Sequence, residues 1–201
     1  MIIREIIPIN TKKSKIVFDD GECFALYKGE IRRLDIEIGR EIGEEEYYTT
    51  IYPTLKKRAF ARLLHILEIS FKSENDIIKK LRLSFYPDEA IKEAIEKAVK
   101  FGYIDDERYA KRYVDTYKDK YSKLKLKYKL MEKGINKEII ENALDEAYID
   151  ESPKIKRLLE KKHYFETDEF EKKQKIIASI MRQGYKYTEI KDIINDISTE
   201  I

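Results

Sequence analysis

The sequence predicts a mainly α-helical protein, in which three tandem three-helix repeats follow a small antiparallel β-rich extension at the N-terminus. Three observations predict this fold. Short runs rich in β-branched and aromatic residues are confined to residues 1–53. From residue 54 onward, apolar residues recur every three or four positions, which is the period of an α-helix. This helical part also repeats itself, at offsets of 49 and 50 residues.

The N-terminal extension contains three segments typical of strands, Ile2–Ile9, Lys15–Asp19 and Glu22–Tyr27. The sequence Asp19-Asp20-Gly21 separates the last two, and this is a hairpin signal because glycine readily adopts positive φ. Leu34–Ile38 is a fourth, weaker strand candidate. We therefore expect a small antiparallel sheet that ends before Pro53.

The repeat is defined by a frame of apolar and turn residues that returns twice. Its corresponding members are Leu81, Leu130 and Ile180; Phe85, Gly134 and Gly184; Tyr86, Ile135 and Tyr185; and Ile91, Ile140 and Ile190. A unit of this length accommodates three short helices. We therefore divide the chain into an extension at 1–53 and repeats at 54–103, 104–152 and 153–201.

Capping residues mark where the nine helices begin and end. Ser73 opens a sequence like a capping box, and Ser152 is an expected N-cap followed by Pro153 in the first turn. Gly134 and Gly184 stand where a helix ends in a left-handed residue. The expected helices are 54–69, 73–84 and 88–101; 105–119, 122–133 and 136–148; and 152–162, 168–183 and 187–197.

One segment, Lys123–Leu130, alternates between lysine and a large apolar or aromatic residue, as a strand would. The repeat frame argues for a helix instead. Leu124 aligns with Asn75 and Gln174 of the sister repeats, while Leu126 and Leu130 keep the helical register. We therefore predict a helix here.

Composition excludes several classes of protein. The 201 residues are 40% charged and carry a net charge of only +2, so the overall charge does not demand a nucleic-acid partner. No apolar stretch approaches the roughly 20 residues of a membrane span, and the N-terminus lacks a secretory signal. A lone Cys23 suits a reducing compartment. We expect a cytoplasmic protein.

The sequence offers no catalytic set, so we expect a protein that is not an enzyme and needs no cofactor or metal. His65 and His163 lie in different repeats, and neither they nor Cys23 have the spacing of a zinc site. We interpret His65, on an apolar helix, as structural, and His163 as solvated. We interpret two acidic runs as structural. Asp105–Glu107 suits the first turn of a helix, and Glu44–Glu46 is expected to form a solvated turn.

A lysine cluster in the second repeat is the strongest candidate binding surface. It comprises Lys118, Lys120, Lys123, Lys125, Lys127 and Lys129. Asp119 is the one acidic residue among them, and Tyr117, Tyr121 and Tyr128 are interleaved. Lysine supplies charge for a phosphate backbone and tyrosine can stack on bases. The alternative is a solvated face whose lysine stems cover apolar surface.

In all three repeats the middle helix is net basic and the third helix net acidic. Equivalent helices of stacked repeats tend to line up, so we expect a basic flank and an acidic flank. Lys123 and Lys127, like Lys125 and Lys129, are four apart and form two rows, which the sequence leaves without a local acid. The acidic flank, expected to face protein, is represented by Glu138, Glu141 and Asp145.

Two motifs carry a resemblance to a known family. Phe101-Gly102-Tyr103-Ile104-Asp105-Asp106-Glu107-Arg108-Tyr109-Ala110, followed by Lys133-Gly134-Ile135-Asn136-Lys137-Glu138-Ile139-Ile140-Glu141-Asn142-Ala143-Leu144, resembles the RecX family. Met181-Arg182-Gln183-Gly184-Tyr185 with Ile190 is similar to the family's closing repeat. The resemblance spans about residues 54–197 and departs in the first repeat. There Ser70-Phe71-Lys72 replaces an Arg-rich, Pro-containing lead, and Phe85 stands where glycine is usual.

The resemblance implies an elongated, curved body that lies in the groove of a filament of the RecA recombinase on single-stranded DNA. It implies a monomeric regulator that binds RecA and lowers its ATPase and strand-exchange activities, in homologous recombination, DNA repair and the SOS response. Weak direct binding to DNA is also expected, whereas membrane binding is not.

Two other classes of function were weighed. One is a transcription regulator, because the segment Leu130–Leu144 superficially resembles a helix-turn-helix. Its second helix carries Glu138, Glu141, Asp145 and Glu146 against Lys137 alone, and phosphate would repel such a recognition helix. The other is a generic helical-repeat scaffold for some other protein, and the motif from Phe101 to Leu144 argues against it.

Overall fold

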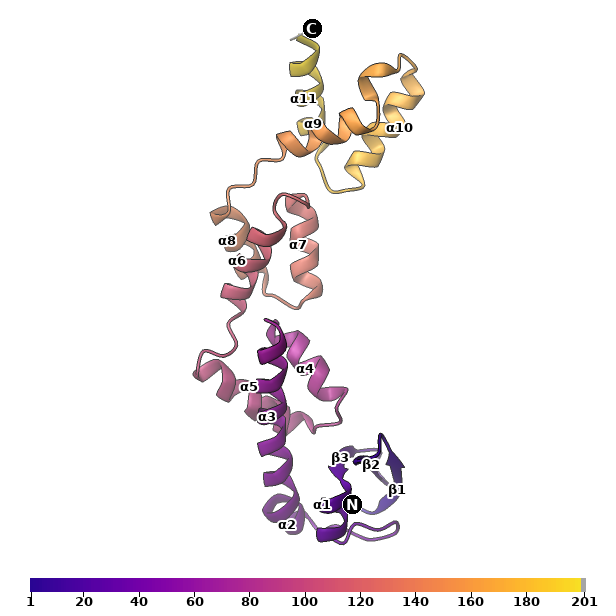
Figure 1. The fold of residues 1–201 in the computed structure, drawn as a ribbon, viewed down its shortest axis with the longest axis vertical. Coiled ribbons are helices and arrows are strands. Elements are labelled where there is room, and N and C mark those ends of the chain that lie inside the picture. Colours follow the sequence, from indigo (N-terminus) through magenta and orange to yellow (C-terminus); the bar gives the residue numbers. More distant parts are fainter. Residues whose placement is uncertain (200–201) are drawn as a thin grey trace. The chain divides into compact units, whose positions relative to one another are not determined.

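A three-stranded antiparallel sheet begins the chain, in a computed structural model that describes residues 1–199. Its strands are β1 (Ile3–Pro8), β2 (Lys13–Phe18) and β3 (Cys23–Tyr27), hydrogen-bonded in the order β1-β2-β3 (Figure 1). The predicted hairpin at residues 19–21 joins β2 to β3, where Gly21 has a φ of 88°. The sheet and its order confirm the expected extension.

The predicted fourth strand is wrong. A short helix, α1 (Lys28–Arg33), follows the sheet, and Leu34 is its C-cap. Asp35 has a φ of 51°, a left-handed conformation that interrupts an extended chain. Leu34 and Ile36 are nevertheless buried in the core beneath the sheet, whereas Ile38 is exposed. Two apolar residues of the predicted strand are therefore buried, but irregular backbone places them there.

Helix also begins earlier than the sequence indicates. Segment α2 (Glu44–Glu46) continues into a π-helical turn, η1 (Tyr47–Ile51), and then into α3 (Tyr52–Ile69). The three glutamates therefore open a helix, and the solvated turn expected for them is wrong. Pro53 lies in the first turn of α3, directly after the π turn. A proline cannot donate a backbone hydrogen bond, which is why the chain tolerates it at such a boundary.

The chain divides into two units, Met1–Asp105 and Asp106–Ile201. In the first unit, α3 packs against α4 (Glu74–Arg82) and α5 (Asp88–Lys100). Their inward positions form one apolar core that includes Leu63, Ile77 and Leu81, each fully buried. Ser73 caps α4 by accepting a hydrogen bond from the Asp76 amide at 3.2 Å, as predicted.

The second unit contains two three-helix groups, the first consisting of α6 (Asp106–Tyr117), α7 (Lys123–Glu132) and α8 (Lys137–Glu146). The second group consists of α9 (Ser152–Lys161), a 3₁₀ turn η2 (Tyr164–Glu166), α10 (Phe170–Met181) and α11 (Tyr187–Thr199). All nine predicted helices are present, with ends shifted by at most a few residues. The segment Lys123–Leu130 is helical because Leu126 and Leu130 are fully buried, which fixes the helical register.

Helix ends agree with the sequence in most places. Gly134 and Gly184 have φ values of 78° and 96°, as expected, and Phe85 adopts 60° at the corresponding position of the first repeat. One cap differs. Helix α9 begins at Ser152 itself, so Glu151 is its N-cap, and the Asp150 carboxylate accepts a hydrogen bond from the Ser152 amide at 2.9 Å.

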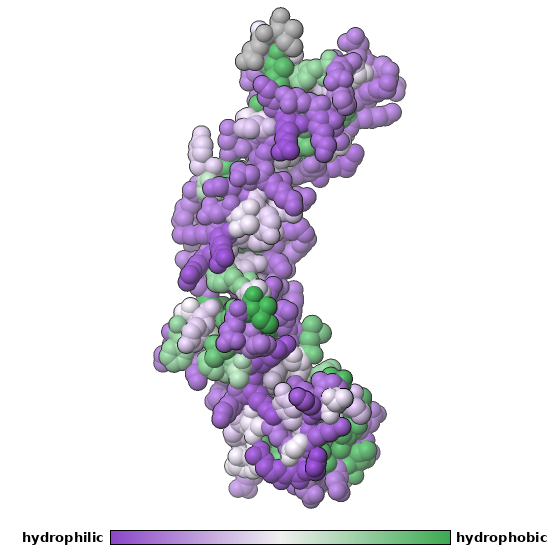
Figure 2. Space-filling view, in the orientation of Figure 1, coloured by the Kyte–Doolittle hydropathy of each residue, from purple (hydrophilic) through white to green (hydrophobic). Residues whose placement is uncertain are grey.

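The exposed surface is largely hydrophilic, with local exceptions. Figure 2 shows hydrophobic side chains gathered on the visible face of the part that holds the sheet. Ile7 and Ile9 are among the exposed large hydrophobic residues of the first unit. Within residues 1–199, the helices are too short or too polar to cross a membrane.

Candidate partner-binding surface

Helix α7 carries most of the predicted lysine cluster, and two contacts fix its position in the second unit. Ser122 caps the helix by accepting a hydrogen bond from the Lys125 amide at 3.2 Å. The same hydroxyl donates to the Gln183 carbonyl at 2.7 Å, at the turn that follows α10. The N-terminus of α7 is therefore anchored to the third repeat, while Leu126 and Leu130 anchor the helix to its own repeat.

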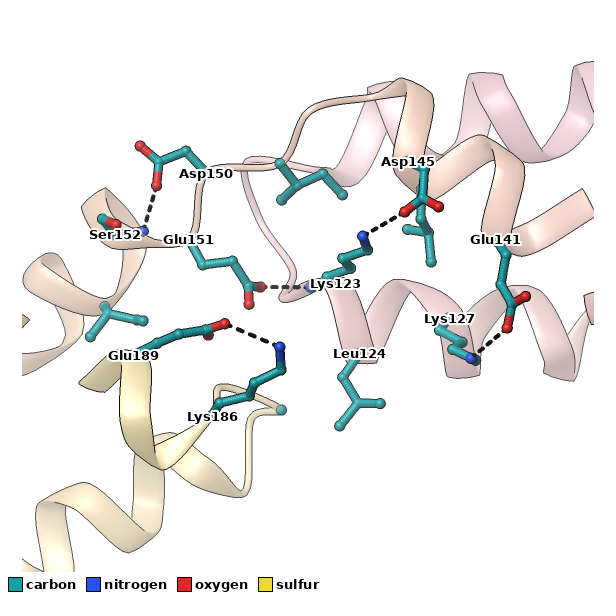
Figure 3. A pocket seen from close by; sticks show the side chains of 14 residues that line it. Lys123, Leu124, Lys127, Glu141, Asp145, Asp150, Glu151, Ser152, Lys186 and Glu189 are labelled. Carbon is teal, nitrogen blue, oxygen red and sulfur yellow. Dashed lines mark hydrogen bonds and ion pairs between the residues drawn. The ribbon is translucent and has the colours of Figure 1, made fainter. Parts of the chain in front are cut away.

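The first lysine row, Lys123 and Lys127, lies against the acidic helix α8 (Figure 3). Lys123 Nζ is 2.8 Å from Asp145 Oδ1, and Lys127 Nζ is 3.2 Å from Glu141 Oε1. The expectation of lysine rows without a local acid is therefore wrong for this row, and it is also wrong for Lys129 of the second row, which pairs with Glu132. Two side chains assigned to the acidic flank neutralise two of the basic cluster, because α7 and α8 pack side by side.

Two further lysines of the cluster pair within their own segments. Lys118 Nζ is 3.1 Å from Asp115 Oδ1, and Lys129 Nζ is 2.8 Å from Glu132 Oε2. The hydrogen bond that Lys129 donates to Glu132 raises the pKa of Lys129 and lowers the pKa of Glu132. Both pairs are exposed to solvent, so each stabilises the fold only weakly.

Lys120 and Lys125 are the members of the cluster that lie away from carboxylates. Within the described part of the chain, neither makes an ion pair. Each ammonium lies instead near the ring of Tyr121, at 5.5 Å from its centroid for Lys120 and 4.6 Å for Lys125. Such cation–π contacts leave the charge available to an incoming anion.

A row of tyrosines follows α6 and ends beyond it at Tyr121, the ring that these two lysines approach. Tyr109, Tyr113, Tyr117 and Tyr121 are four residues apart, with successive ring centroids 6.1, 4.6 and 5.5 Å apart. Burial raises the pKa of Tyr113, whose ring lies inside the row. The row was not predicted, although the four-residue spacing of these tyrosines is the signal that reveals it. Their faces pack mainly on one another.

A cleft of about 650 Å³ lies between the two repeats of the second unit. Lys123 donates its backbone N–H to Glu151 Oε1 at 2.6 Å, and Lys186 Nζ is 3.4 Å from Glu189 Oε1 (Figure 3). Burial and the nearby charge of Glu189 raise the pKa of Glu151. The other oxygen of Glu189 is buried and lacks a hydrogen-bond partner within the described residues. The cleft is thus a charged junction between repeats.

The remaining candidates for chemistry are dispersed. His65 is exposed beside Glu68 instead of packing in a core, and His163 is exposed beside Glu166. Asp106 and Glu107 occupy the first turn of α6, as predicted. Among residues 1–199, no three His, Cys, Asp or Glu side chains are placed to hold a metal ion. Glu138 is exposed, and its amide donates to the Asn136 side chain that caps α8.

Comparisons with known proteins agree with this architecture. Residues 105–144 match the family model described as RecX, second three-helix domain. The chain is 31% identical over 199 residues to a regulatory protein RecX of Caldanaerobacter subterraneus subsp. tengcongensis, covering 97% of this chain and 99% of the relative. It is 32% identical to a regulatory protein RecX of Clostridium acetobutylicum, covering 87% of this chain and 80% of that one.

Solved structures support the fold. A crystal structure of regulatory protein RecX aligns over 94% of this chain and 98% of its own, with a TM-score of 0.65 and 24% identity. The crystal structure of RecX from Lactobacillus salivarius aligns over 73% of this chain and 99% of its own, with a TM-score of 0.63 and 24% identity. Because the sequence similarity extends over nearly the whole length of both proteins, this chain belongs to the RecX family of regulatory proteins.

Proposed function

We propose that this protein binds the RecA recombinase and its filament on single-stranded DNA, and that it lowers RecA ATPase and strand exchange. The observation that carries the proposal is the full-length similarity to proteins named regulatory protein RecX. The proposed regulator works in the cytoplasm as a monomer and acts by occupying a surface of the filament, without chemistry of its own.

Within this proposal, the lysine cluster contacts the filament, with Lys120 and Lys125 as its main electrostatic contacts. Neither lysine makes an ion pair among residues 1–199, so a phosphate or a carboxylate of the filament can approach them without breaking an existing ion pair. Lys123 and Lys127 must first break their ion pairs with Asp145 and Glu141 before they can contact a phosphate. Of the proposed protein-facing acids, Glu138 is free of such a pair within the same range, and it is the acid best placed to meet a basic partner.

The first test concerns the regulatory activity itself. Adding the protein to its cognate RecA on single-stranded DNA is expected to lower the rate of ATP hydrolysis, because the bound regulator holds filament subunits in place. The measurement is a coupled ATPase assay with the regulator in several-fold excess over filament subunits. An unchanged rate at that excess would contradict the proposed function.

A second test separates the paired lysines from the unpaired ones. The double variant Lys120→Gln/Lys125→Gln is expected to bind bare single-stranded DNA and the filament more weakly. It should also reduce the slope of log affinity against log salt by about 1.4, because two fewer counterions are displaced at about 0.7 per phosphate contact. Titrations across a salt series measure both quantities.

The matched controls remove the same number of charges elsewhere. Lys156→Gln/Lys161→Gln changes two exposed lysines of α9 and should leave the affinity and slope near wild type. Lys123→Gln/Lys127→Gln should reduce the slope less than the Lys120/Lys125 variant, because those lysines are already paired. If all three double variants behave alike, the cluster does not contact phosphate.

A further inference from the structure

Helix α7 has a second apolar face, which points away from the core. Leu124, Tyr128 and Met131 are exposed by 43%, 57% and 52%, respectively. Their spacing of four and three residues places them in one stripe along the helix. The buried Leu126 and Leu130 lie on the opposite side of α7. We call Leu124, Tyr128 and Met131 the outward stripe, and Figure 3 shows Leu124 projecting from a different side of α7 than Lys123.

The sister helices show that the repeat fold does not require this stripe. At the same three frame positions, α4 carries Asn75, Lys79 and Arg82, and α10 carries Gln174, Ala178 and Met181. Both helices pack in their own repeats with polar or small residues at positions where α7 has leucine and tyrosine. The apolar residues of α7 therefore serve something other than packing within the repeat.

The charge around the stripe indicates the chemistry of its partner. Lys125 and Lys127 flank the stripe on its two sides, following the helical period. Lys127 pairs with Glu141, whereas Lys125 makes no ion pair among residues 1–199, so the rim keeps a positive charge on its Lys125 side. An apolar stripe with a basic rim complements an apolar protein surface edged by carboxylates.

Two other occupants fit less well. A nucleic-acid backbone offers phosphate to the lysines, but it provides little apolar surface for Leu124 and Met131. A second copy that packed α7 on α7 would bring the unpaired Lys125 side chains of the two copies into the same interface, which is destabilising.

We propose that the outward stripe of α7 is a docking face for a partner protein that presents an apolar patch rimmed by acidic side chains. The inference rests on the proposed function, because it places that partner within the RecA filament. Burial of the stripe supplies binding energy, while the lysine rim selects an acidic surface.

The test replaces the stripe with residues that the fold already uses. Leu124 also lines the cleft between the two repeats, so Tyr128→Ala is made as a single variant as well and should leave thermal stability unchanged. Leu124→Gln/Tyr128→Ala gives α7 the face of α10 and should keep its helicity. It is expected to weaken binding to the RecA filament by at least about tenfold, because apolar interface anchors carry most of the binding energy. Leu83→Gln, which changes an exposed leucine in the first unit, is the control and should bind as wild type does.

Four outcomes distinguish the alternatives. If the wild-type protein does not bind the filament, the proposed function and this docking face both fail. If the wild type binds and the stripe variant binds equally well, the docking face alone is overturned. If the variant loses affinity for bare single-stranded DNA while keeping its affinity for RecA, nucleic acid occupies the stripe. If sedimentation shows a wild-type dimer that the variant abolishes, a second copy occupies it. Each of the last two results also overturns the proposal.

Discussion

Two turns occupy the same frame position in different repeats, and different neighbours cover them. In the first unit, the turn after α4 is covered by the sheet: Ala25 of β3 donates its N–H to the Phe85 carbonyl at 3.2 Å. In the second unit, the turn after α10 is covered by the N-terminus of α7, where Ser122 donates to the Gln183 carbonyl at 2.7 Å. The same turn is therefore covered by a strand in the first repeat and by a helix N-terminus in the third.

The difference explains why one turn has a phenylalanine and the other a glycine. Both positions have positive φ, but Phe85 tolerates it with its ring half-buried beneath Lys15, whose ammonium lies 4.9 Å from the ring centroid. At Gly184, a Cβ atom would lie 2.5 Å from Ser122 Oγ and 3.3 Å from Leu124 Cβ. Glycine is therefore required at 184 for two reasons: its φ is positive, and α7 approaches too closely to leave room for a side chain.

The largest effect is expected for Gly184→Ala. The methyl group would force Ser122 away, which costs the cap of α7 in addition to the left-handed strain. We expect a loss of about 2–4 kcal/mol in the free energy of unfolding. Chemical denaturation followed by circular dichroism measures this loss.

Gly102→Ala is the matched control for that change. Gly102 also has a positive φ, of 69°, but no atom lies within 4 Å of the added methyl group. Its cost should be the backbone strain alone, about 1–2 kcal/mol. Equal losses in the two variants would show that the contact with α7 is not what requires glycine at 184.

A smaller effect is expected for Ser122→Ala. The change removes the N-cap of α7. It also removes the hydroxyl that donates a hydrogen bond to the Gln183 carbonyl. We expect destabilisation by about 2 kcal/mol, because a lost cap and a lost hydrogen bond each cost about 1 kcal/mol. Ser122→Thr keeps the hydroxyl and should recover part of the loss in the same denaturation experiment. An alanine variant as stable as wild type would show that this hydroxyl does not tie the two repeats together.

The helices could be predicted from the sequence because each depends on the spacing of apolar residues within its own segment. Residues such as Leu81, Leu130 and Ile180 return in one frame, and each is buried in its own repeat. What was missed depends on distant neighbours. Leu34 and Ile36 are buried without forming a strand, since the sheet covers irregular backbone there.

The candidate site was predictable as a set of residues but not as an arrangement of charges. The spacing of Lys123 and Lys127 places them in one row, but it does not reveal that Asp145 and Glu141 face them from α8. That pairing depends on how two helices cross. The alternation of lysine and apolar residues in Lys123–Leu130 was judged only as evidence for a strand or for a helix. Neither alternative considered a helix with two apolar faces. The alternation reflects a helix with apolar residues on both its inner and its outer face.

The smallest expected effect concerns the junction of the second and third repeats, and it depends on pH. Burial, together with the charge of Glu189, raises the pKa of Glu151 above its usual value of 4.5, while the Lys123 amide and Lys154 act in the opposite direction. The folded state therefore holds the proton of Glu151 more tightly than the unfolded state does. Stability from this group is present at low pH and is lost as pH rises from the usual value through the raised one.

Glu151→Gln removes this penalty while keeping an oxygen that can accept from the Lys123 amide. The variant should be more stable than wild type at neutral pH, by less than about 1 kcal/mol because the site is partly solvated. Below the usual pKa of a glutamate the two proteins should be equally stable. Thermal melts from acidic to neutral pH measure the difference, with Glu160→Gln as a control that removes one exposed carboxylate of α9. A variant that is less stable than wild type at neutral pH would mean that ionised Glu151 stabilises the junction. The hydrogen bond to Lys123 would then outweigh both the burial of the carboxylate and its repulsion by Glu189.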